Sequence, residues 1–332
     1  MMIGSWFQRR MVRSALLACL LPIFAMPAAA QWKPERNVEI IVGTGPGGGQ
    51  DKTARTLQRI MQERKLLPVP VSVVNKPGGG GAVAWTYLNQ HAADAHYVEI
   101  GNPTLLTNNI IGRSTISYTD FTPLAILFTE SVAISVRADS PLKTGRDLME
   151  RLRQDSASVS FSVGSSLGSA NHIAMGELAR LAGADTKRLK AVVFQGGGEA
   201  MTALLGGHVD LIASAANNVV PHIAAGKIRV LGITAPHRLA GPLAAVPTWR
   251  EQGAEVTTNN WRMVAGGKSL SAAQIAYWED VLRRATETEE WKADLQRNGF
   301  ENLFMTHEPA LAFLKSQNEA LRRALADIGM AK

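Results

Sequence analysis

Short apolar, β-branched runs alternate with segments of helical periodicity along most of the chain. The runs predict strands at residues 38–42, 71–74, 97–100, 159–163, 191–194, 209–213 and 230–233. Apolar positions at helical spacing predict helices between these strands, and two amphipathic helices follow at 272–285 and 308–326. Strands that alternate with helices are typical of βαβ units. The pattern predicts an α/β fold with a mostly parallel sheet flanked by helices.

Two further apolar segments, Ser131 to Val136 and Val256 to Val264, break this alternation. The chain has no Ser/Pro-rich linker between two halves, so domains joined by a loose tether are not expected. We interpret the two segments as strands that cross between two lobes. Lobe 1 is then discontinuous, with residues 31–132 plus 255–332, and lobe 2 comprises residues 133–254. A cleft between the lobes follows from this division.

Residues 1–30 resemble a secretory signal peptide. Arg9, Arg10 and Arg13 precede an apolar stretch at 14–27, which ends in three alanines with cleavage expected near Ala30. An uncleaved membrane anchor is the alternative, but the stretch is shorter than the roughly 20 residues that span a bilayer. Cys19 lies in a lipobox-like sequence, which leaves a lipoprotein as a further alternative. We expect a periplasmic protein that begins at Gln31.

Composition limits the chemistry of the mature chain. The single cysteine lies in the leader, so cleavage removes both disulfide and thiol chemistry. Loss of the three leader arginines lowers the net charge from +7 to +4. No run of lysines and arginines reaches the length of a nucleic-acid patch, and we expect no nucleic-acid partner. The charge supports a mild attraction for anionic ligands.

Four junctions between a predicted strand and the following helix are rich in small residues. They lie at 45–51, 77–81, 164–169 and 196–198. In an open parallel sheet such junctions share the carboxyl edge of the strands, where ligands bind. Glycine lets a ligand approach the backbone, and a helix N-terminus offers unpaired N–H groups to an anion. The junctions predict a carboxylate or phosphate site, although tight turns alone also require glycine.

Two of these junctions fit other known motifs. Residues 43–48 match G-x-G-x-x-G, but the second strand ends at Asn75 with no acid for a ribose, and no Walker A lysine follows. Residues 164–168 match the G-x-S-x-G nucleophile elbow, which would make Ser166 a nucleophile with Asp210 as the acid and His222 or His237 as the base. The alternative interpretation is that these serines cap the following helix. A secreted serine hydrolase is therefore the alternative function.

The remaining candidates point to structural roles. The 7 histidines show no metal-ligand spacing, so we expect no metal and no cofactor. Asp51 is interpreted as a helix N-cap that also shapes the glycine-rich loop or binds a ligand ammonium group. Trp85 and Trp261 are interpreted as core residues.

Taken in order, these motifs resemble the Bug or TctC family of solute-binding proteins from tripartite tricarboxylate transporters. The matching stretches are PGGGQD at 46–51, VNKPGGGG at 74–81, YTDFTP at 118–123, GSSLGS at 164–169, LLGGHVDL at 204–211 and PHIAAGK at 221–227. The resemblance implies a periplasmic, non-enzymatic protein of Venus-flytrap fold that closes on a small organic anion. It also implies delivery of a di- or tricarboxylate, or a related carboxylate, to a membrane permease.

By position, the resemblance implies a set of ligand-binding residues in both lobes. Lobe 1 would contribute Thr44, Gly47, Gly48, Gly49, Gln50, Asp51, Gly79, Gly80 and Thr104. Lobe 2 would contribute Ser165, Ser166, Ser169, Gly197, Gly198 and Ser214. A monomer is expected. A receptor that signals to a sensor kinase is a further alternative to transport.

Two positions depart from the family pattern. Many members have an aromatic residue at the position of Thr44 and an aspartate at the position of Ser214. Loss of the aromatic ring removes a wall of the pocket, and loss of the carboxylate makes lobe 2 less repulsive to an anion. These departures leave the identity of the ligand open.

Overall fold

A computed structural model describes residues 32–164 and 166–331. The leader predicted at 1–30, with Cys19 and the cleavage position Ala30, lies outside the described residues. So does Ser165, one of the predicted site residues.

The described strands are β1 (Val38–Val42), β2 (Val71–Asn75), β3 (Tyr97–Gly101), β4 (Phe121–Arg137), β5 (Ser160–Val163), β6 (Lys190–Val193), β7 (Leu211–Ala215), β8 (Ile228–Ile233), β9 (Asn259–Gly267) and β10 (Glu301–Met305). The helices are α1 (Gly49–Glu63), α2 (Ala82–Asn89), α3 (Thr104–Ile110), α4 (Gly145–Gln154), α5 (Ala170–Leu181), α6 (Gly197–Leu205), α7 (Val220–Ala224), α8 (Ala272–Thr286), α9 (Glu289–Asn298) and α10 (His307–Asp327). Every strand predicted from the sequence is present within two residues at its start, apart from the two crossing segments. Helices α3, α4, α7 and α9 and strand β10 were not predicted from the sequence.

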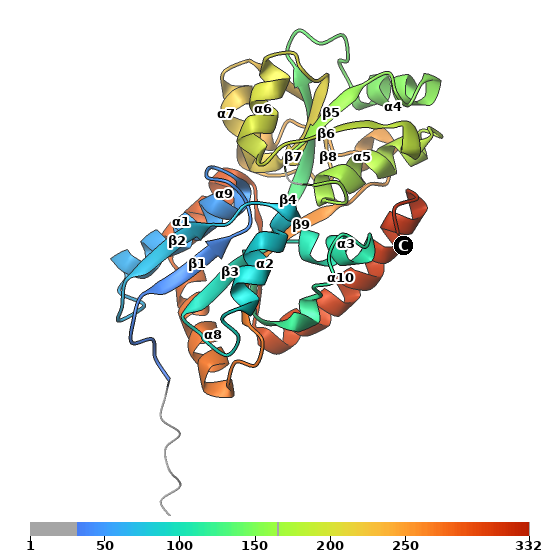
Figure 1. The fold of residues 1–332 in the computed structure, drawn as a ribbon. Coiled ribbons are helices and arrows are strands. Elements are labelled where there is room, and N and C mark those ends of the chain that lie inside the picture. The colour runs from blue at the N-terminus through green and yellow to red at the C-terminus, as the bar shows by residue number, and fades with distance from the viewer. Residues whose placement is uncertain (1–31, 165, 332) are drawn as a thin grey trace, which may run out of the picture. The chain divides into compact units, whose positions relative to one another are not determined.

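The strands form one mixed sheet, which confirms the α/β class. Their order is β2-β1-β3-β9-β4-β7-β5-β6, and β8 and β10 also pair with β4 (Figure 1). β1 is parallel to β2 and β3, and β5 is parallel to β6 and β7. β9 runs antiparallel to β3 and β4, and β4 runs antiparallel to β7, β8 and β10. The sheet is thus mixed rather than mostly parallel, because β4 and β9 separate the two parallel groups.

β4 is the element that joins the two parallel groups. Its first part, up to Ser131, pairs with β9 and β10. From Val132 onward it pairs with β7 and β8. We call the first group sheet A (β1, β2, β3, β9, β10 and the start of β4) and the second sheet B (β5, β6, β7, β8 and the end of β4). Of the crossing segments predicted from the sequence, Ser131 to Val136 lies within β4, and Val256 to Val264 overlaps the first part of β9. β9 pairs with β4 over residues 121–131 of β4.

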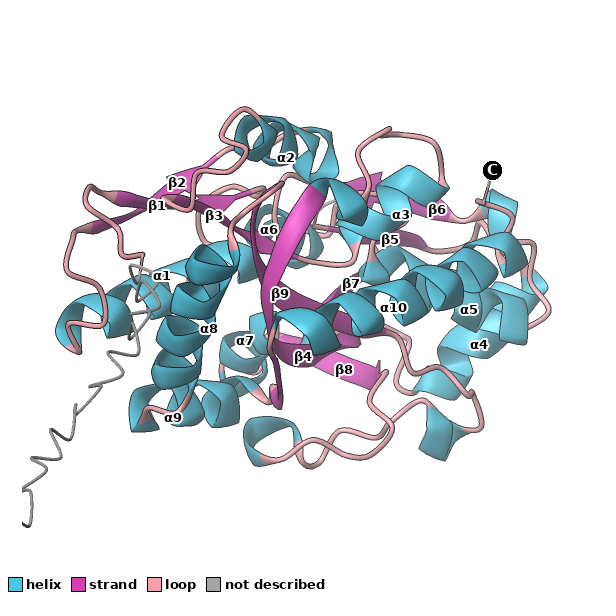
Figure 2. Cartoon of the chain, turned by 90° about the horizontal axis from the view of Figure 1, so that it is seen from below, coloured by secondary structure: helices cyan, strands magenta, loops and turns pink. Residues whose placement is uncertain are grey.

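Alternating side chains of sheet A build two cores on its opposite faces. In β1, Val38, Ile40 and Val42 face α1, α8 and α9, whereas Ile41 faces α2, α3 and α10. This is the two-residue period of a strand that is buried on both sides. Figure 2 shows the helices on both sides of the strands. Trp85 and Trp261 are buried in the second core, as predicted.

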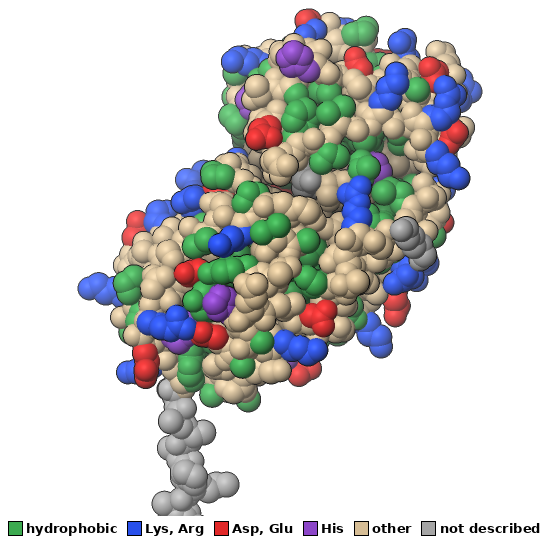
Figure 3. All heavy atoms as spheres, viewed as in Figure 1, with side chains coloured by type: hydrophobic (Ala, Val, Ile, Leu, Met, Phe, Trp, Pro, Cys, Tyr) green, Lys and Arg blue, Asp and Glu red, His purple; other side chains and the backbone are tan. Residues whose placement is uncertain are grey.

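Sheet B is covered in the same manner. Leu148 of α4 and Leu178 of α5 lie in a core on one face, with Val132, Ile134 and Val136 of β4. Helices α6 and α7 pack on the other face around Ala133 and Ile212. On the face drawn in Figure 3, Lys and Arg side chains are scattered and interspersed with Asp and Glu. The surface in this view agrees with the absence of a long basic run in the sequence.

Candidate functional site

Three of the described helices, α1, α2 and α6, have a glycine as N-cap and no side-chain cap, and two of them, α1 and α6, meet at one cavity. Helix α1 follows β1, and its N-cap is Gly48; helix α6 follows β6, and its N-cap is Gly196. Neither glycine has a side chain that could accept a hydrogen bond from the first turn of its helix. In α5, by contrast, Oγ of Ser169 accepts such a bond. The first N–H groups of α1 and α6 therefore remain available to an anion, and each helix dipole favours negative charge there.

These two N-termini line one cavity of about 50 Å3, which we call the central cavity. From the sheet A side it is lined by Thr44, Gly48, Gly49, Gln50, Asn102, Asn260 and Arg262, and from the sheet B side by Gly164, Asn171, Gly197, Ser214, Ala215 and Asn218. A smaller cavity of about 10 Å3, the side cavity, shares Thr44, Gln50 and Asn102 and adds Gly43, Gly78, Gly80, Thr104 and Gln195. Both cavities are thus lined by residues from the sheet A side and from the sheet B side.

The structure brings eight of the predicted site residues to these cavities. Thr44, Gly48, Gly49, Gln50, Gly197 and Ser214 line the central cavity, and Gly80 and Thr104 line the side cavity. The predicted residues Gly47, Asp51, Gly79, Ser166, Ser169 and Gly198 line neither cavity.

The sequence indicated Asp51 as the N-cap of α1. In the structure the N-cap is Gly48, and Asp51 lies in the first turn of the helix. Its Oδ2 accepts hydrogen bonds from the backbone N–H of Gly47 at 2.8 Å and from Nε of Arg55 at 3.0 Å. Its Oδ1 accepts one from Nδ2 of Asn75 at 2.9 Å. Burial alone would raise the pKa of Asp51, but the hydrogen bonds from Arg55, Gly47 and Asn75 outweigh it and lower the pKa. Through these hydrogen bonds, Asp51 holds the glycine-rich loop that precedes α1 in place.

The hydrolase triad considered from the sequence is not assembled. Asp210 accepts hydrogen bonds from the N–H and hydroxyl of Ser160, both at 2.7 Å, at the start of β5. Ser166 follows the opposite end of β5, and a strand of four residues spans roughly 13 Å. The Oγ of Ser166 is buried and has no hydrogen-bond partner among the described residues. Leu167 and Gly168 form a turn, and Ser169 is the residue that caps α5.

Five residues that bring polar side chains to the central cavity were not predicted from the sequence. They are Asn102, Asn171, Asn218, Asn260 and Arg262. None belongs to a glycine-rich junction motif, and single asparagines carry no signal of their own. Arg262 does carry one, because it interrupts an otherwise apolar strand, Trp261 to Ala265, where a charge demands a buried partner.

The partner of Arg262 is Glu130, on the neighbouring strand β4. The Nη2 of Arg262 donates to Oε1 of Glu130, which also accepts a hydrogen bond from Nδ2 of Asn260 at 2.8 Å. The side chains of Arg262 and Glu130 are 3% and 0% exposed. Burial raises the pKa of Glu130, and the attraction of Arg262 opposes that rise. Arg262 thus brings a guanidinium to the cavity wall, held in place by a fully buried carboxylate.

Several buried polar atoms of the cavity wall have no hydrogen-bond partner within the described part of the chain. They include Oγ1 of Thr44, Oδ1 of Asn171 and Nε of Arg262. Buried polar atoms are normally paired, so these three atoms have hydrogen-bonding capacity left for a polar ligand.

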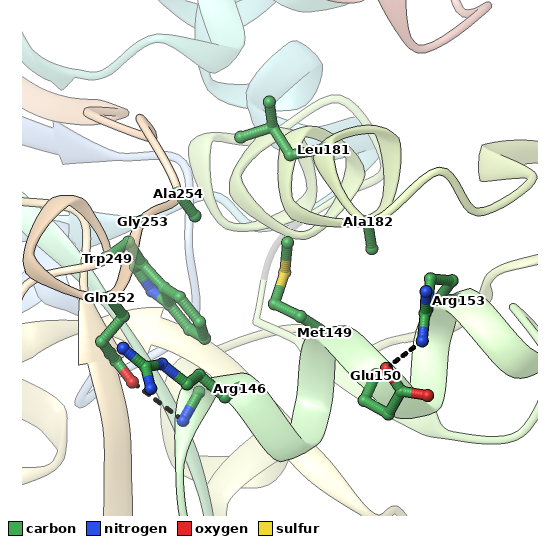
Figure 4. Close-up of a pocket in the computed structure, with 11 residues that line it drawn as sticks. Arg146, Met149, Glu150, Arg153, Leu181, Ala182, Trp249, Gln252, Gly253 and Ala254 are labelled. Atoms are coloured by element: carbon green, nitrogen blue, oxygen red, sulfur yellow. Dashed lines mark hydrogen bonds and ion pairs between the residues drawn. The ribbon is translucent and has the colours of Figure 1, made fainter.

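A larger cavity, of about 310 Å3, lies elsewhere (Figure 4). It is formed by α4, the end of α5 and the segment 249–254, with Met149, Leu181 and Trp249 among its lining residues. Of its three charged lining residues, Arg146, Glu150 and Arg153, the last two pair with each other at the surface. It contains none of the predicted site residues and no uncapped helix N-terminus, so we do not assign ligand binding to it.

Among the described residues, no group of His, Cys, Asp and Glu side chains is arranged to hold a metal ion. No described helix combines the length and apolarity needed to cross a membrane.

Comparison with known proteins assigns the chain to a family. The profile described as "Tripartite tricarboxylate transporter family receptor" matches residues 53–330. The protein BugT of Bordetella pertussis is 28% identical over 270 residues, which cover 80% of both chains. The periplasmic binding protein BugD has a TM-score of 0.82 and 24% identity over 90% of this chain and 99% of its own. A protein of R. palustris solved with adipate has a TM-score of 0.82 and 23% identity, with coverage of 90% and 99%. The chain thus has the fold of periplasmic binding proteins and belongs to the TctC family, the solute-binding receptors of tripartite tricarboxylate transporters, which are not enzymes.

Proposed function

We propose that this protein binds a small organic anion, a carboxylate, in the central cavity and delivers it to the permease of a tripartite tricarboxylate transporter. One observation carries the proposal: the uncapped N-termini of α1 and α6 and the guanidinium of Arg262 line the same cavity. Backbone N–H groups, helix dipoles and a buried cation all favour negative charge. The adipate bound to the R. palustris relative supports a carboxylate as the ligand class.

We further propose that residues 31–132 plus 255–332 and residues 133–254 act as two lobes that close on the ligand. In support, the connection between sheets A and B runs through β4, which changes its partners between Ser131 and Val132. A ligand that contacts both helix N-termini binds the closed arrangement better than the open one, and so shifts the population toward closure.

Transport requires the protein outside the cytoplasm, and we propose export through the leader at 1–30 with cleavage near Ala30. Mass spectrometry of the protein recovered from the periplasm tests this step. A mature chain that begins at Gln31 supports it, whereas retention of the leader or a lipid on Cys19 contradicts it.

The experiment that tests the proposed function is a thermal-shift screen of the chain from Gln31 to Lys332. Mono-, di- and tricarboxylates, amino acids and nucleotides form the panel. A ligand at about 100 times its Kd adds about 2.7 kcal/mol to the free energy of unfolding, which produces a clear rise in melting temperature. Stabilisation by carboxylates alone supports the proposal. Stabilisation by nucleotides alone, or by no carboxylate, overturns it.

A further inference from the structure

The side chains at the wall of the two cavities contribute almost no net charge. Among the described residues that line the central and side cavities, Arg262 is the single residue with a charged side chain. Its charge is matched by Glu130, which lies directly behind it on β4 and is fully buried. The side-chain charges at this wall therefore sum to zero.

The remaining positive potential comes from the backbone. Helices α1 and α6 point their N-termini at the cavity, and each contributes about half an elementary positive charge. Lys52 is exposed, and its Nζ donates to Oδ1 of Asn218 at 3.3 Å; water weakens its charge, although its attraction still opposes the rise in the pKa of Glu130. Together, the two helix dipoles give the cavity wall about one positive charge.

The geometry around Arg262 explains why Glu130 is needed. Two of the guanidinium nitrogens are occupied: Nη2 by Glu130, and Nη1 by the carbonyl oxygens of Asn260 and Trp261 at 3.3 and 3.2 Å. The Nε–H of Arg262 and Oε2 of Glu130 are both buried without a hydrogen-bond partner among the described residues. The Nε–H of Arg262 is thus an unpaired donor, and Oε2 of Glu130 is an unpaired anionic oxygen that repels a second negative charge.

We propose that the Glu130–Arg262 pair selects the charge of the ligand: Arg262 contacts the ligand carboxylate, and Glu130 positions Arg262 and limits the cavity to ligands with one net negative charge. This inference rests on the proposed function, because it assumes that the central cavity binds a carboxylate. It goes further by naming the class, which is monocarboxylates and not dicarboxylates of the same length. Arg262 is a binding residue and Glu130 a positioning residue.

The test is calorimetric titration with two pairs of ligands of equal carbon number, butanoate against succinate and hexanoate against adipate, in which a terminal methyl group is replaced by a second carboxylate. The wild-type chain is expected to bind the monocarboxylate of a pair about tenfold more tightly, which is about 1.4 kcal/mol. Glu130→Gln keeps an oxygen that accepts from Asn260 and Arg262 but removes the negative charge. The variant is expected to gain affinity for the dicarboxylate, and the preference should shift by about tenfold or more, because the interaction scales with ligand charge.

Controls separate charge from damage to the fold. Glu251→Gln removes the same charge from an exposed pair with Arg238, and its preference should equal that of the wild type. The double variant Arg262→Gln with Glu130→Gln leaves no unpaired buried charge and should bind both members of each pair weakly. The preference of the wild type for the monocarboxylate or the dicarboxylate is measured without any variant. This measurement therefore tests the inference even if Glu130→Gln does not fold.

The outcomes are distinct. A wild-type preference for the monocarboxylate that Glu130→Gln narrows or reverses supports the inference. A wild-type preference for the dicarboxylate, or a folded Glu130→Gln variant with an unchanged preference, overturns it and leaves the proposed function in place. If the wild type binds no carboxylate of any charge, both proposals fail.

Discussion

Arg262 lies so close to Gly49 that no side chain fits between them. A Cβ atom on Gly49 would stand 2.8 Å from Nη2 of Arg262 and 3.9 Å from Oε1 of Glu130. The glycine at the first residue of α1 therefore lets the guanidinium reach the positive end of the helix. Glu130 offsets the repulsion that this position would otherwise cause.

We predict that Gly49→Ala displaces Arg262 and weakens carboxylate binding by at least tenfold. Overpacking should also lower the free energy of unfolding by about 1–3 kcal/mol. Gly145→Ala is the matched control, because Gly145 is the first residue of α4 and its Cβ would lie 2.5 Å from Trp249, outside the two cavities. Urea denaturation and calorimetric titration of both variants make the comparison. Equal affinities in the two variants would show that the Gly49 contact does not serve binding.

A second close approach occurs at Gly80, where the loop before α2 comes close to Ser166, which follows β5. The φ of Gly80 is +66°, and a Cβ there would lie 2.9 Å from Nδ2 of Asn108 and 3.0 Å from Oγ of Ser166. We predict that Gly80→Ala opposes closure and lowers ligand affinity, in addition to a cost of about 1–2 kcal/mol for the left-handed backbone.

Gly183→Ala controls for the backbone cost alone, because Gly183 has a φ of +74° and nothing within 4 Å of its Cβ position. Both variants should melt at a lower temperature, but Gly183→Ala should bind the ligand like the wild type. If the two variants bind equally, the approach of Gly80 to Ser166 has no role in closure.

The fold could be predicted from the sequence because its strands are apolar runs bounded by glycines. β1 begins and ends at the predicted residues, and β3 does so within one residue. Helix α9 was missed because its pattern is largely polar, with Trp291 and Leu295 as its buried residues. The mixed sheet was missed because strand direction depends on pairing between distant segments.

The site could be predicted only where backbone conformation determines it. Glycine-rich junctions indicate uncapped helix N-termini, so Gly48, Gly49 and Gly197 were found. The Glu130–Arg262 pair depends on the register of β4 against β9, in which Phe128 opposes Arg262 and Glu130 opposes Asn260. A register between strands more than 100 residues apart leaves no local pattern in the sequence. The lone charges inside two apolar strands were the available signal.

We predict that the chain does not react with a fluorophosphonate probe. Ser166 and Asp210 lie at opposite ends of β5, and Asp210 is occupied by Ser160, so no base activates the hydroxyl. Gel fluorescence after incubation with the probe measures the reaction, with a known serine hydrolase as the positive control. Labelling of the wild type that Ser166→Ala abolishes would contradict the site described above.

His172 makes stability depend on pH. Burial, together with the nearby Arg113, lowers the pKa of His172 to about 4, and its Nδ1 accepts a hydrogen bond from the N–H of Gly168 at 3.3 Å. Between about pH 4 and 6.5 the unfolded chain binds a proton at this residue that the folded chain does not, so stability rises with pH in this window. We predict that this group costs about 2 kcal/mol when the pH falls from 7 to 5.

Chemical denaturation of the wild type and of His172→Gln at both pH values isolates this effect. The loss of stability on acidification should be smaller by about 2 kcal/mol in the variant, because glutamine does not titrate. An equal loss in both proteins would show that His172 is protonated at no cost in the folded chain.

In the proposed binding mode, a carboxylate lies between the N-termini of α1 and α6. The most direct measurement is a crystal structure of the chain from Gln31 to Lys332 with the carboxylate that stabilises it best in the thermal-shift screen. We predict that carboxylate oxygens lie within hydrogen-bond distance of N–H groups in the first turn of α1 or α6 and of Nε of Arg262. A carboxylate bound instead in the larger cavity beside Met149 and Trp249 would contradict the account.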